Sequence, residues 1–565
     1  MNTTQNGTTT GSGDARRRWV VAAGHSRSEW TTLFASAGAA LACLVLLVAT
    51  SPGLPMVWDE GISIERAEGV ARWFVRLRHD GFAAFARAAV EQDWRYTVDI
   101  EGHPAFYGLV IAFGRWVSDG WLDPLSAARF GPMLFFSIAA GAMFYRLWQD
   151  AGPPAALGGL VALLTMPRLF AHAHFALYDG ILTSCWILAW AAFAPALKSR
   201  RWTVLWGLAL GMTMSSKFTG WLAPPVFVAW AVIYGDRSAV TKLLLGFGGA
   251  LVTFFVLNPR LWHAPMAGMS TFFELNLNRA DTYNIPTLFF GRRYDMHQPL
   301  PWYNTLVWTA ITVPAGTLAL GAVGLISSLR GWARNPAGVL LVGHWLVLMV
   351  VRALPPSPPH DAERLFLPSF AFLAALAGVG SGVVWQWAAR RRCSRPVRSW
   401  LAVAGMFAAL AGSASSLAWY APQWLSYYNL LIGGLRGAER AGFEAAYYWD
   451  ALDGEALDWL HEHTDRDEKI AFAAFPSNNL VLMERWGTLR RAWQPHPPGR
   501  TRWYVVQRRP PFWRAADRWL AEHGRPAYQK TIRDPASGWG PWRLDVPLLE
   551  VFPYEQYERA MRAER

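Results

Sequence analysis

The chain has 565 residues, of which 53% are hydrophobic and only 16% are charged, a balance that excludes an ordinary soluble enzyme. The formal net charge of +13 does not indicate nucleic-acid binding, because Lys and Arg lie mostly in short loops between apolar blocks. Only three cysteines are present, which excludes a disulfide framework.

The chain opens on a segment rich in Thr, Gly and Asn, which predicts a disordered cytoplasmic tail over residues 1–30. The first apolar run, at about residues 32–50, is long enough for an uncleaved membrane anchor. The arginines at 16–18 precede it and, by the positive-inside rule, keep the N-terminus in the cytoplasm. Residues 51–125 are then expected outside, as the first external loop.

Later in the chain, every second loop between apolar blocks is basic, which is typical of loops that alternate across a membrane. This alternation makes the helix at about 178–197 run inward, so that Asp179 opens on the same external side as Asp59. The segment 104–118 is short and is expected to be re-entrant or interfacial. The count gives about eleven transmembrane helices. The basic loops contain Lys198, Arg200, Arg201, Arg237, Lys242, Arg330, Arg334 and the arginines at 390–398.

The same count leaves residues 259–303 outside as a second long loop, together with everything after about residue 420. The last part of the chain is polar, with helical spacing in Trp449–His463 and strand-like runs at Ile470–Phe475 and Tyr504–Gln507. We therefore expect a mainly α, polytopic membrane protein. Its predicted domains are a transmembrane domain at 31–419 and a small extracytoplasmic α/β domain at 420–565.

An acidic pair, Asp59 and Glu60, follows the first apolar run directly, at the membrane surface. Carboxylates held there are costly without a role, which makes both residues candidates for catalysis. The alternative is structural, because helix starts favour acidic residues and Asp59 can cap the amphipathic helix that follows. Position alone leaves both interpretations open.

Trp58-Asp59-Glu60 resembles the acidic motif in the first external loop of the GT-C membrane glycosyltransferases. The likeness is to the protein O-mannosyltransferases and the aminoarabinose transferases of lipid A. Further motifs fit in the same order over roughly the first 385 residues, and others resemble bacterial members of the group. They are Gly102-His103-Pro104, Tyr178-Asp179-Gly180, Ser216-Lys217-Phe218, Asp361–Pro368, Leu425–Asn429 with Gly433-Gly434, and Tyr448-Trp449.

This resemblance implies a GT-C fold and an inverting hexosyl- or pentosyltransferase. Such an enzyme moves a sugar from a polyprenyl-phosphate donor, of the dolichyl-phosphate type, to a hydroxyl acceptor on the outer face. The acceptor hydroxyl must lose a proton, and a carboxylate near the anomeric carbon can accept it. The family places this base at the position that matches Asp59, with Glu60 and Asp179 in support.

The leaving lipid phosphate requires cations, and Lys217 and Arg364 at outer helix ends are the candidates for binding it. His360, beside Asp361, is a third candidate, for phosphate contact or proton handling. The alternatives are a snorkelling lysine at the interface and an arginine that only marks topology.

Five further residues are predicted to bind substrate. The long external loop contains arginines and tyrosines that suit covering a sugar phosphate, although it equally suits an interfacial helix. The other candidates come from motifs of the resemblance. The five are His103, Arg292, Arg293, Tyr427 and Asn429.

His172 and His174 are weak candidates for metal ligands, near Asp179 at one outer helix mouth. Residues two apart on a helix point to different faces, so the two imidazoles share an ion only if the helix has already ended. We therefore expect no cofactor, with a divalent metal as the less favoured alternative. No nucleotide-binding fingerprint is present, which favours a lipid-linked donor.

Two other functions stay open: a transporter or flippase of lipid-linked or polar substrates, and a catalytically inactive relative that binds glycan. The sequence has no internal repeat of the kind that transporters show. The expected partners are the donor lipid, the bilayer and an acceptor that is a protein, a glycolipid or a polymer; no nucleic-acid partner is expected. The motifs favour a bacterial inner membrane, with the N-terminus cytoplasmic and the C-terminal domain extracytoplasmic.

Overall fold

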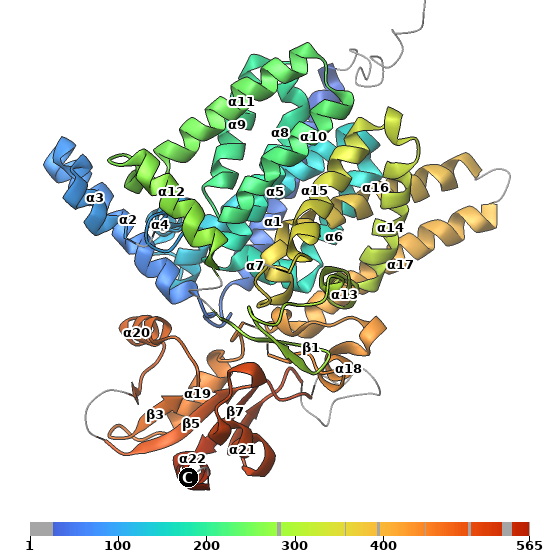
Figure 1. Ribbon diagram of the computed structural model, residues 1–565. Coiled ribbons are helices and arrows are strands. Elements are labelled where there is room, and N and C mark those ends of the chain that lie inside the picture. Colours follow the sequence, from blue (N-terminus) through green and yellow to red (C-terminus); the bar gives the residue numbers. More distant parts are fainter. Residues whose placement is uncertain are drawn as a thin grey trace, which may run out of the picture.

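The computed structural model describes residues 26–95, 97–279, 284–355, 357–391, 396–446, 448–494, 499–533 and 545–563. The predicted tail up to residue 25, and Arg392 and Arg395 of one basic loop, lie outside the described residues. Helices dominate, and a five-stranded sheet near the C-terminus lies at one end of the helical bundle (Figure 1). The predicted mainly helical fold with a small C-terminal sheet region is thereby confirmed.

Six helices in the described part of the chain are long and apolar enough to cross a bilayer. They are α1 (Ser26–Thr50), α5 (Pro124–Ala151), α8 (Tyr178–Ala196), α11 (Arg237–Val256), α16 (Leu367–Arg391) and α17 (Pro396–Tyr420). The apolar windows of α5, α8 and α16 are 78–83% buried, whereas those of α1, α11 and α17 are only 17–28% buried. The first three helices therefore form the inside of the bundle. The other three expose large apolar side chains such as Leu41, Leu244 and Val397, which suits contact with lipid.

A seventh candidate span is a bent pair, α6 (Pro153–Leu164) and α7 (Pro167–His174), whose axes differ by 74°. Pro167 stands at the start of α7, where its missing N–H is tolerated, so the chain turns there instead of continuing α6. Shorter apolar helices complete the bundle, and the count of about eleven crossings stays a prediction. These are α4 (Phe106–Ser118), α10 (Ala223–Tyr234), α14 (Ala315–Leu329) and α15 (Pro336–Arg352).

Close approach between α14 and α16 depends on glycine. A methyl group at Gly324 of α14 would lie 1.8 Å from the carbonyl oxygen of Leu376 in α16. Small residues at such crossings let helix backbones pack closely in a membrane, where burying apolar surface supplies little driving force.

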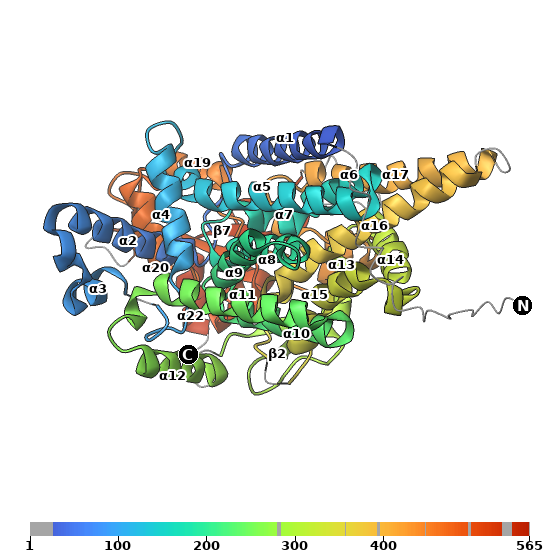
Figure 2. The same ribbon diagram turned by 90° about the horizontal axis from the view of Figure 1, so that it is seen from above.

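Two segments of the first external loop project from the bundle at one side, and the α16–α17 hairpin projects at another (Figure 2). The two loop segments are α2 (Glu60–Asp80) and α3 (Arg87–Asp93). The segment predicted as re-entrant or interfacial is α4, whose Arg115 forms an ion pair with Glu68 of α2 at 3.0 Å. Whether α4 crosses the bilayer stays a prediction.

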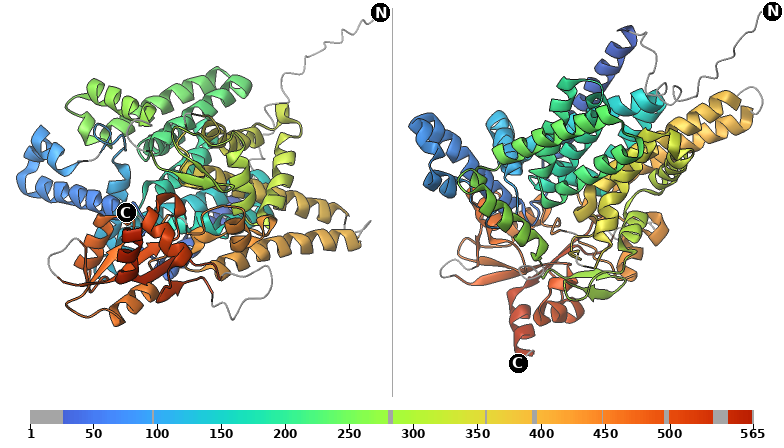
Figure 3. Two further views of the ribbon diagram at one scale, coloured as in Figure 1. Left: turned by 60° about the horizontal axis from the view of Figure 1, so that its bottom comes forward. Right: turned by 45° about the horizontal axis from the view of Figure 1, so that its top comes forward.

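The C-terminal sheet has the strand order β4-β3-β5-β7-β6, with β3 parallel to β4 and β5, and β7 antiparallel to β5 and β6. It packs against the same end of the bundle in both views of Figure 3. The strands are β3 (Lys469–Phe472), β4 (Ala492–Trp493), β5 (Thr501–Gln507), β6 (Tyr528–Lys530) and β7 (Leu549–Pro553). Thus β3 and β5 lie where strands were predicted. The helix predicted at Trp449–His463 is α19 (Gly454–Glu462).

One more helix, α9 (Arg200–Met214), packs against α8 and α11 in the bundle. Most of the other elements lie in connecting segments and around the sheet. They include the 3₁₀ helix η3 (Phe218–Leu222), α12 (Pro265–Leu277), β1 (Thr287–Phe289), β2 (Arg292–Tyr294), α13 (Asn304–Thr312), the 3₁₀ helix η7 (Ala362–Phe366), α18 (Gly434–Arg440), α20 (Ser477–Arg485), α21 (Ala515–His523) and α22 (Tyr554–Ala563). The antiparallel β1–β2 hairpin and α12 both belong to the long loop predicted at 259–303. The domain limits stay a prediction.

Candidate active site

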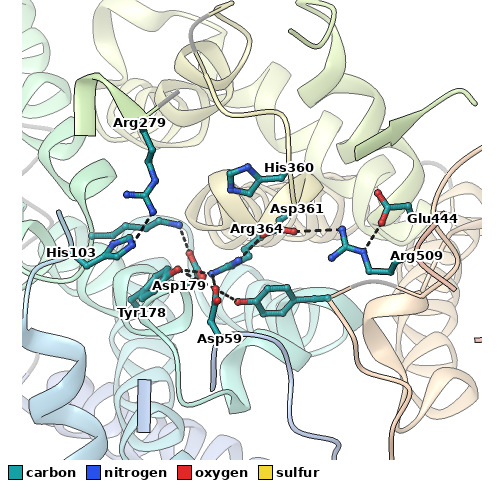
Figure 4. A network of polar contacts seen from close by, with 12 residues as sticks. Asp59, His103, Tyr178, Asp179, Arg279, His360, Asp361, Arg364, Glu444 and Arg509 are labelled. Atoms are coloured by element: carbon teal, nitrogen blue, oxygen red, sulfur yellow. Dashed lines mark hydrogen bonds and ion pairs between the residues drawn. The ribbon is translucent and has the colours of Figure 1, made fainter. Parts of the chain in front are cut away.

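Arg364, in η7, binds three carboxylates at once. Its Nε donates to Asp179 Oδ2, its Nη1 to Asp361 Oδ2 and its Nη2 to Asp59 Oδ2, each at 2.7 Å (Figure 4). The Arg364 side chain is only 4% exposed, so these ion pairs are weakly screened. A planar guanidinium spreads five N–H groups over three nitrogens and can bind carboxylates in three directions, whereas a lysine offers its three N–H groups from a single nitrogen.

Asp179, at the start of α8, joins two cations. Its Oδ1 accepts a hydrogen bond from Lys217 Nζ at 2.7 Å, while Oδ2 is held by Arg364. The first turn of a helix favours a carboxylate, because the free backbone N–H groups there carry partial positive charge. Lys217 follows α9 and lies 4.9 Å above the ring of Tyr178, which fixes the ammonium against an aromatic face.

Asp59 occupies the N-cap position of α2, yet its side chain makes no capping hydrogen bond. Oδ2 instead accepts hydrogen bonds from Arg364 and from the Tyr448 hydroxyl at 2.5 Å. Among the described residues no group donates to Oδ1, and the side chain keeps 25% of its surface exposed. The geometry thus favours the functional interpretation of Asp59 over capping, since one oxygen is fixed and the other is open.

Glu60 points away from this cluster. Its carboxylate accepts hydrogen bonds from Arg129 of α5 at 2.6 and 2.8 Å, and both side chains are fully buried. The backbone N–H groups of Val57 and Ala176 donate to the same carboxylate. Glu60 therefore ties the first external loop to the bundle and reaches Asp59 only through the backbone.

His103 and Arg279 lie on one side of the cluster (Figure 4). The His103 ring stacks on Tyr178 with centroids 5.0 Å apart, and Arg279 Nη2 donates to His103 Nε2 at 3.1 Å. Burial lowers the pKa of His103 well below its ordinary value, and the nearby arginines and lysine lower it further. His103 is therefore a neutral group beside several cations, close to the cluster as predicted for a substrate contact.

His360 precedes Asp361, and its Nδ1 is buried without a hydrogen-bond partner in the described part of the chain. Burial lowers the pKa of His360 to about 4, so the ring is neutral near pH 7. A neutral imidazole can donate a hydrogen bond to a phosphate, although it contributes no charge. Within the described segments, the ring forms no hydrogen bond with Arg364 or Lys217.

The other predicted substrate contacts are not brought to the cluster. Arg292 and Arg293 are exposed on β2, and Tyr427 is buried with its ring against Tyr420. The amide of Asn429 donates to two carbonyl oxygens at the end of α13, both at 2.6 Å. The last two residues thus anchor the segment after α17.

The two candidate metal ligands do not share a site. His174 hydrogen-bonds through Nε2 to Thr50 and through Nδ1 to the Phe170 carbonyl. His172 is buried, neither ring nitrogen has a hydrogen-bond partner among the described residues, and its ring centroid lies 6.3 Å from that of Tyr448. Over the described ranges, no group of three or more His, Cys, Asp or Glu side chains is arranged to hold a metal ion.

Sequence reasoning assigned no role to two tyrosines of the cluster. Tyr178 accepts a hydrogen bond from Arg364 Nη2 at 2.7 Å, and Tyr448 donates to Asp59. Both tyrosines stand in motifs that carry the resemblance, and these motifs are the sequence signal by which the tyrosines could have been found. Arg509 was missed entirely: it lies 3.8 Å from Asp361 and donates to Glu444 at 2.6 Å, and no local pattern marks it.

Known proteins resemble the chain in both sequence and fold. The family model of the dolichyl-phosphate-mannose-protein mannosyltransferases matches residues 103–263. The crystal structure of ArnT from Cupriavidus metallidurans bound to undecaprenyl phosphate matches with a TM-score of 0.50 at 14% identity, covering 93% of this chain and 98% of that chain. No curated protein matches in sequence.

A second structure, of the archaeal oligosaccharyltransferase AglB from Archaeoglobus fulgidus with an inhibitory peptide and a dolichol-phosphate, has a TM-score of 0.45 at 11% identity. It covers 83% of this chain and 69% of that chain. The fold is that of ArnT, and the predicted resemblance to the GT-C glycosyltransferases of the mannosyltransferase and ArnT group is confirmed. The chain is an integral, multi-pass membrane protein.

Proposed function

We propose that the chain is an inverting glycosyltransferase that moves a sugar from a polyprenyl phosphate to a hydroxyl acceptor at the outer face of the membrane. The observation that carries the proposal is the carboxylate of Asp59. Its Oδ2 is held by Arg364 and Tyr448, while Oδ1 accepts no hydrogen bond from the described residues. Arg364 also binds Asp179, whose other carboxylate oxygen binds Lys217, so two buried cations belong to the same cluster. A fixed base next to a cation pair is what transfer from a phosphate to a hydroxyl requires.

In the proposed step, Asp59 Oδ1 takes the proton of the acceptor hydroxyl as its oxygen bonds to the anomeric carbon. The bond between that carbon and the phosphate oxygen breaks on the opposite face, and the electron pair leaves with the polyprenyl phosphate. One displacement inverts the anomeric configuration. Orientation of acceptor and donor by the site supplies part of the rate, because it replaces a bimolecular encounter.

The leaving phosphate gains negative charge during this step, and Lys217 and Arg364 are placed to stabilise it. Both cations are almost fully buried, with 10% and 4% of their side chains exposed, so their effect on a nearby anion is weakly screened. Asp179 bridges them and keeps them in position while the donor is absent. Arg279, beside His103, is a further cation at the edge where a phosphate can enter.

The position of the charges favours an enzyme over a transporter. Asp59, Asp179 and Arg364 stand where helices begin or where loops meet them, rather than at breaks in the middle of a span. Tyr448 and Arg509, from beyond α17, contact the same cluster. Because the base and the cations are all present, the structure gives no reason to favour an inactive relative. The motifs favour a bacterial inner membrane, which belongs to this proposal, whereas they single out neither one hexose or pentose nor one acceptor.

The test is to incubate purified protein in lipid with a panel of radiolabelled polyprenyl-phosphate hexoses and pentoses. Wild type should consume one donor, by transfer or slow hydrolysis, and that donor identifies the sugar. Asp59→Asn keeps the shape but not the basicity, so we expect the rate to fall by about 10²–10⁴-fold.

Asp123→Asn is a matched control, since Asp123 only caps α5 and asparagine caps equally well. Full activity in Asp59→Asn would remove Asp59 from the mechanism. Donor binding without turnover in wild type would favour the transporter or the inactive relative instead.

A further inference from the structure

Tyr448 lies between α18 and α19, beyond the last long apolar helix, yet it contacts the first external loop. Its hydroxyl donates to Asp59 Oδ2 at 2.5 Å, across 389 residues of sequence. The Arg364 guanidinium lies over the Tyr448 ring, 4.2 Å from its centroid. Tyr448 therefore touches both the proposed base and the arginine that holds it.

The backbone at this point adopts a conformation that L-residues rarely take. Tyr448 and the next residue, Trp449, have φ of 62° and 59°, in the left-handed region. Two such residues in a row persist only when their surroundings enforce the conformation. Strained positions of this kind cluster at functional sites, where a side chain must be aimed at one target.

The residues that enforce this backbone conformation come from both ends of the chain. The Trp58 N–H donates to the Tyr448 carbonyl at 3.3 Å, and the Trp58 ring lies 3.9 Å from that of Trp449. On the other side, the Arg509 guanidinium lies 4.0 Å from the centroid of Trp449. The Tyr448 hydroxyl is thus aimed at Asp59 by contacts made on the neighbouring residues Trp58 and Trp449.

The protonation state of Tyr448 agrees with this arrangement. Burial raises the pKa of Tyr448 well above its ordinary value, so the phenol stays protonated and acts as the donor to the carboxylate. With Tyr448 and Arg364 both on Oδ2, the carboxylate plane is fixed from one side. Oδ1 is left for the proton of the acceptor.

We propose that Tyr448 is a positioning residue of the transfer reaction: delivered by the C-terminal domain, it fixes the Asp59 carboxylate through Oδ2 so that Oδ1 receives the acceptor proton. The inference rests on the proposed function, since it assigns Tyr448 to the same reaction. It also makes the C-terminal domain part of the active site, because transfer then requires this domain to be docked on the first external loop.

The test is Tyr448→Phe, which keeps the ring beneath Arg364 and removes only the hydroxyl. We expect kcat to fall by about 10–100-fold, because a hydrogen bond to a charged group is lost, while the KM for the donor changes less than about threefold. That hydrogen bond favours the ionised carboxylate, so the acid limb of the kcat/KM profile should move to higher pH by about one unit.

Tyr504→Phe is the matched control. It removes the hydroxyl of another buried tyrosine, which donates to the carboxylate of Asp517 at 2.7 Å, inside the C-terminal domain and outside the cluster. Its kinetics and pH profile should match wild type. If Tyr448→Phe fails to fold, Tyr448→Asn serves instead, because asparagine tolerates positive φ but is too short to replace the phenol. It should show the same drop in kcat and the same shift of the acid limb.

Wild-type kcat and an unmoved acid limb in Tyr448→Phe, together with loss of activity in Asp59→Asn, would overturn this inference and keep the proposed function. A drop in kcat without movement of the acid limb would also overturn it, because a merely structural role has that signature. Full activity of Asp59→Asn, or no transfer by wild type, would refute the proposed function itself, and the role of Tyr448 would fall with it.

Discussion

Arg364 shows how one side chain organises a charged site where loops meet the helical bundle. Three of its nitrogens bind three different carboxylates, from the first external loop, from α8 and from the residue before η7. Asp179 and Asp361, only 1% and 6% exposed, would each be costly to keep ionised alone. The shared guanidinium keeps them together in one geometry, which gives a physical reason for an arginine on the side predicted to be external, where the positive-inside rule disfavours it.

Arg364→Lys tests this arrangement, because it keeps the positive charge and removes the fork of donors. A lysine has one nitrogen on a flexible stem, so it does not hold Asp59, Asp179 and Asp361 in the geometry of the fork, and the base loses its fixed orientation. We expect the transfer rate at saturating donor to fall by about a hundredfold or more.

Arg87→Lys is the control, since the exposed Arg87 pairs only with Glu91 one turn away. Equal rates for the Arg364→Lys enzyme and wild type would mean that only the charge of Arg364 matters.

At the scale of helices and loops, buried ion pairs attach the external segments to the bundle. Arg129 of α5 binds Glu60 at the start of α2, and Arg168 of α7 binds Glu363 of η7 at 2.8 Å. All four side chains are fully buried. These pairs set where α2 and η7 leave the membrane helices, and so they fix the distance between Asp59 and Arg364.

Arg129→Met tests this structural role, because it leaves the carboxylate of Glu60 buried without its cation. We expect a loss of about 3–5 kcal/mol in the free energy of unfolding, since an uncompensated buried charge is expensive. Thermal unfolding in detergent, followed by tryptophan fluorescence, measures the change.

The double variant Glu60→Gln with Arg129→Met should recover much of this stability, because no charge is then left unpaired. If the single and double variants were equally unstable, packing around Arg129 would be the cause rather than its charge.

For the molecule as a whole, contacts between distant segments decide which parts share one side of the membrane. Asn479 of α20 accepts a hydrogen bond from the Gly61 N–H and donates to the Val57 carbonyl, and Arg485 pairs with Glu68. The C-terminal domain and the first external loop therefore lie on the same side, whatever the exact number of crossings between them.

This arrangement predicts the result of a topology experiment. A reporter fused after Arg398 should be cytoplasmic and one fused after Tyr420 external, because α17 lies between these points and the C-terminal domain contacts the external loop. Cysteines at Asp123 and at Arg485 should both be labelled from outside by a membrane-impermeant maleimide. A cytoplasmic reporter after Tyr420 would contradict the proposed location of the active site.

The sequence by itself determined the class of protein, because long uncharged runs have few places to lie except in hydrocarbon. It also marked Asp59, Asp179, Lys217 and Arg364, since charges next to such runs are costly and therefore stand out. Their motifs, read in order, predicted the GT-C resemblance that the fold confirms.

Only the tertiary structure decided how these residues are paired. Glu60 stands beside Asp59 in sequence but is bound by Arg129, whereas Tyr448 and Arg509 reach the cluster from the far end of the chain. Adjacent residues at a helix start point in different directions. A hydrogen bond across 389 residues depends on the packing of a whole domain, and no local pattern of residues encodes it.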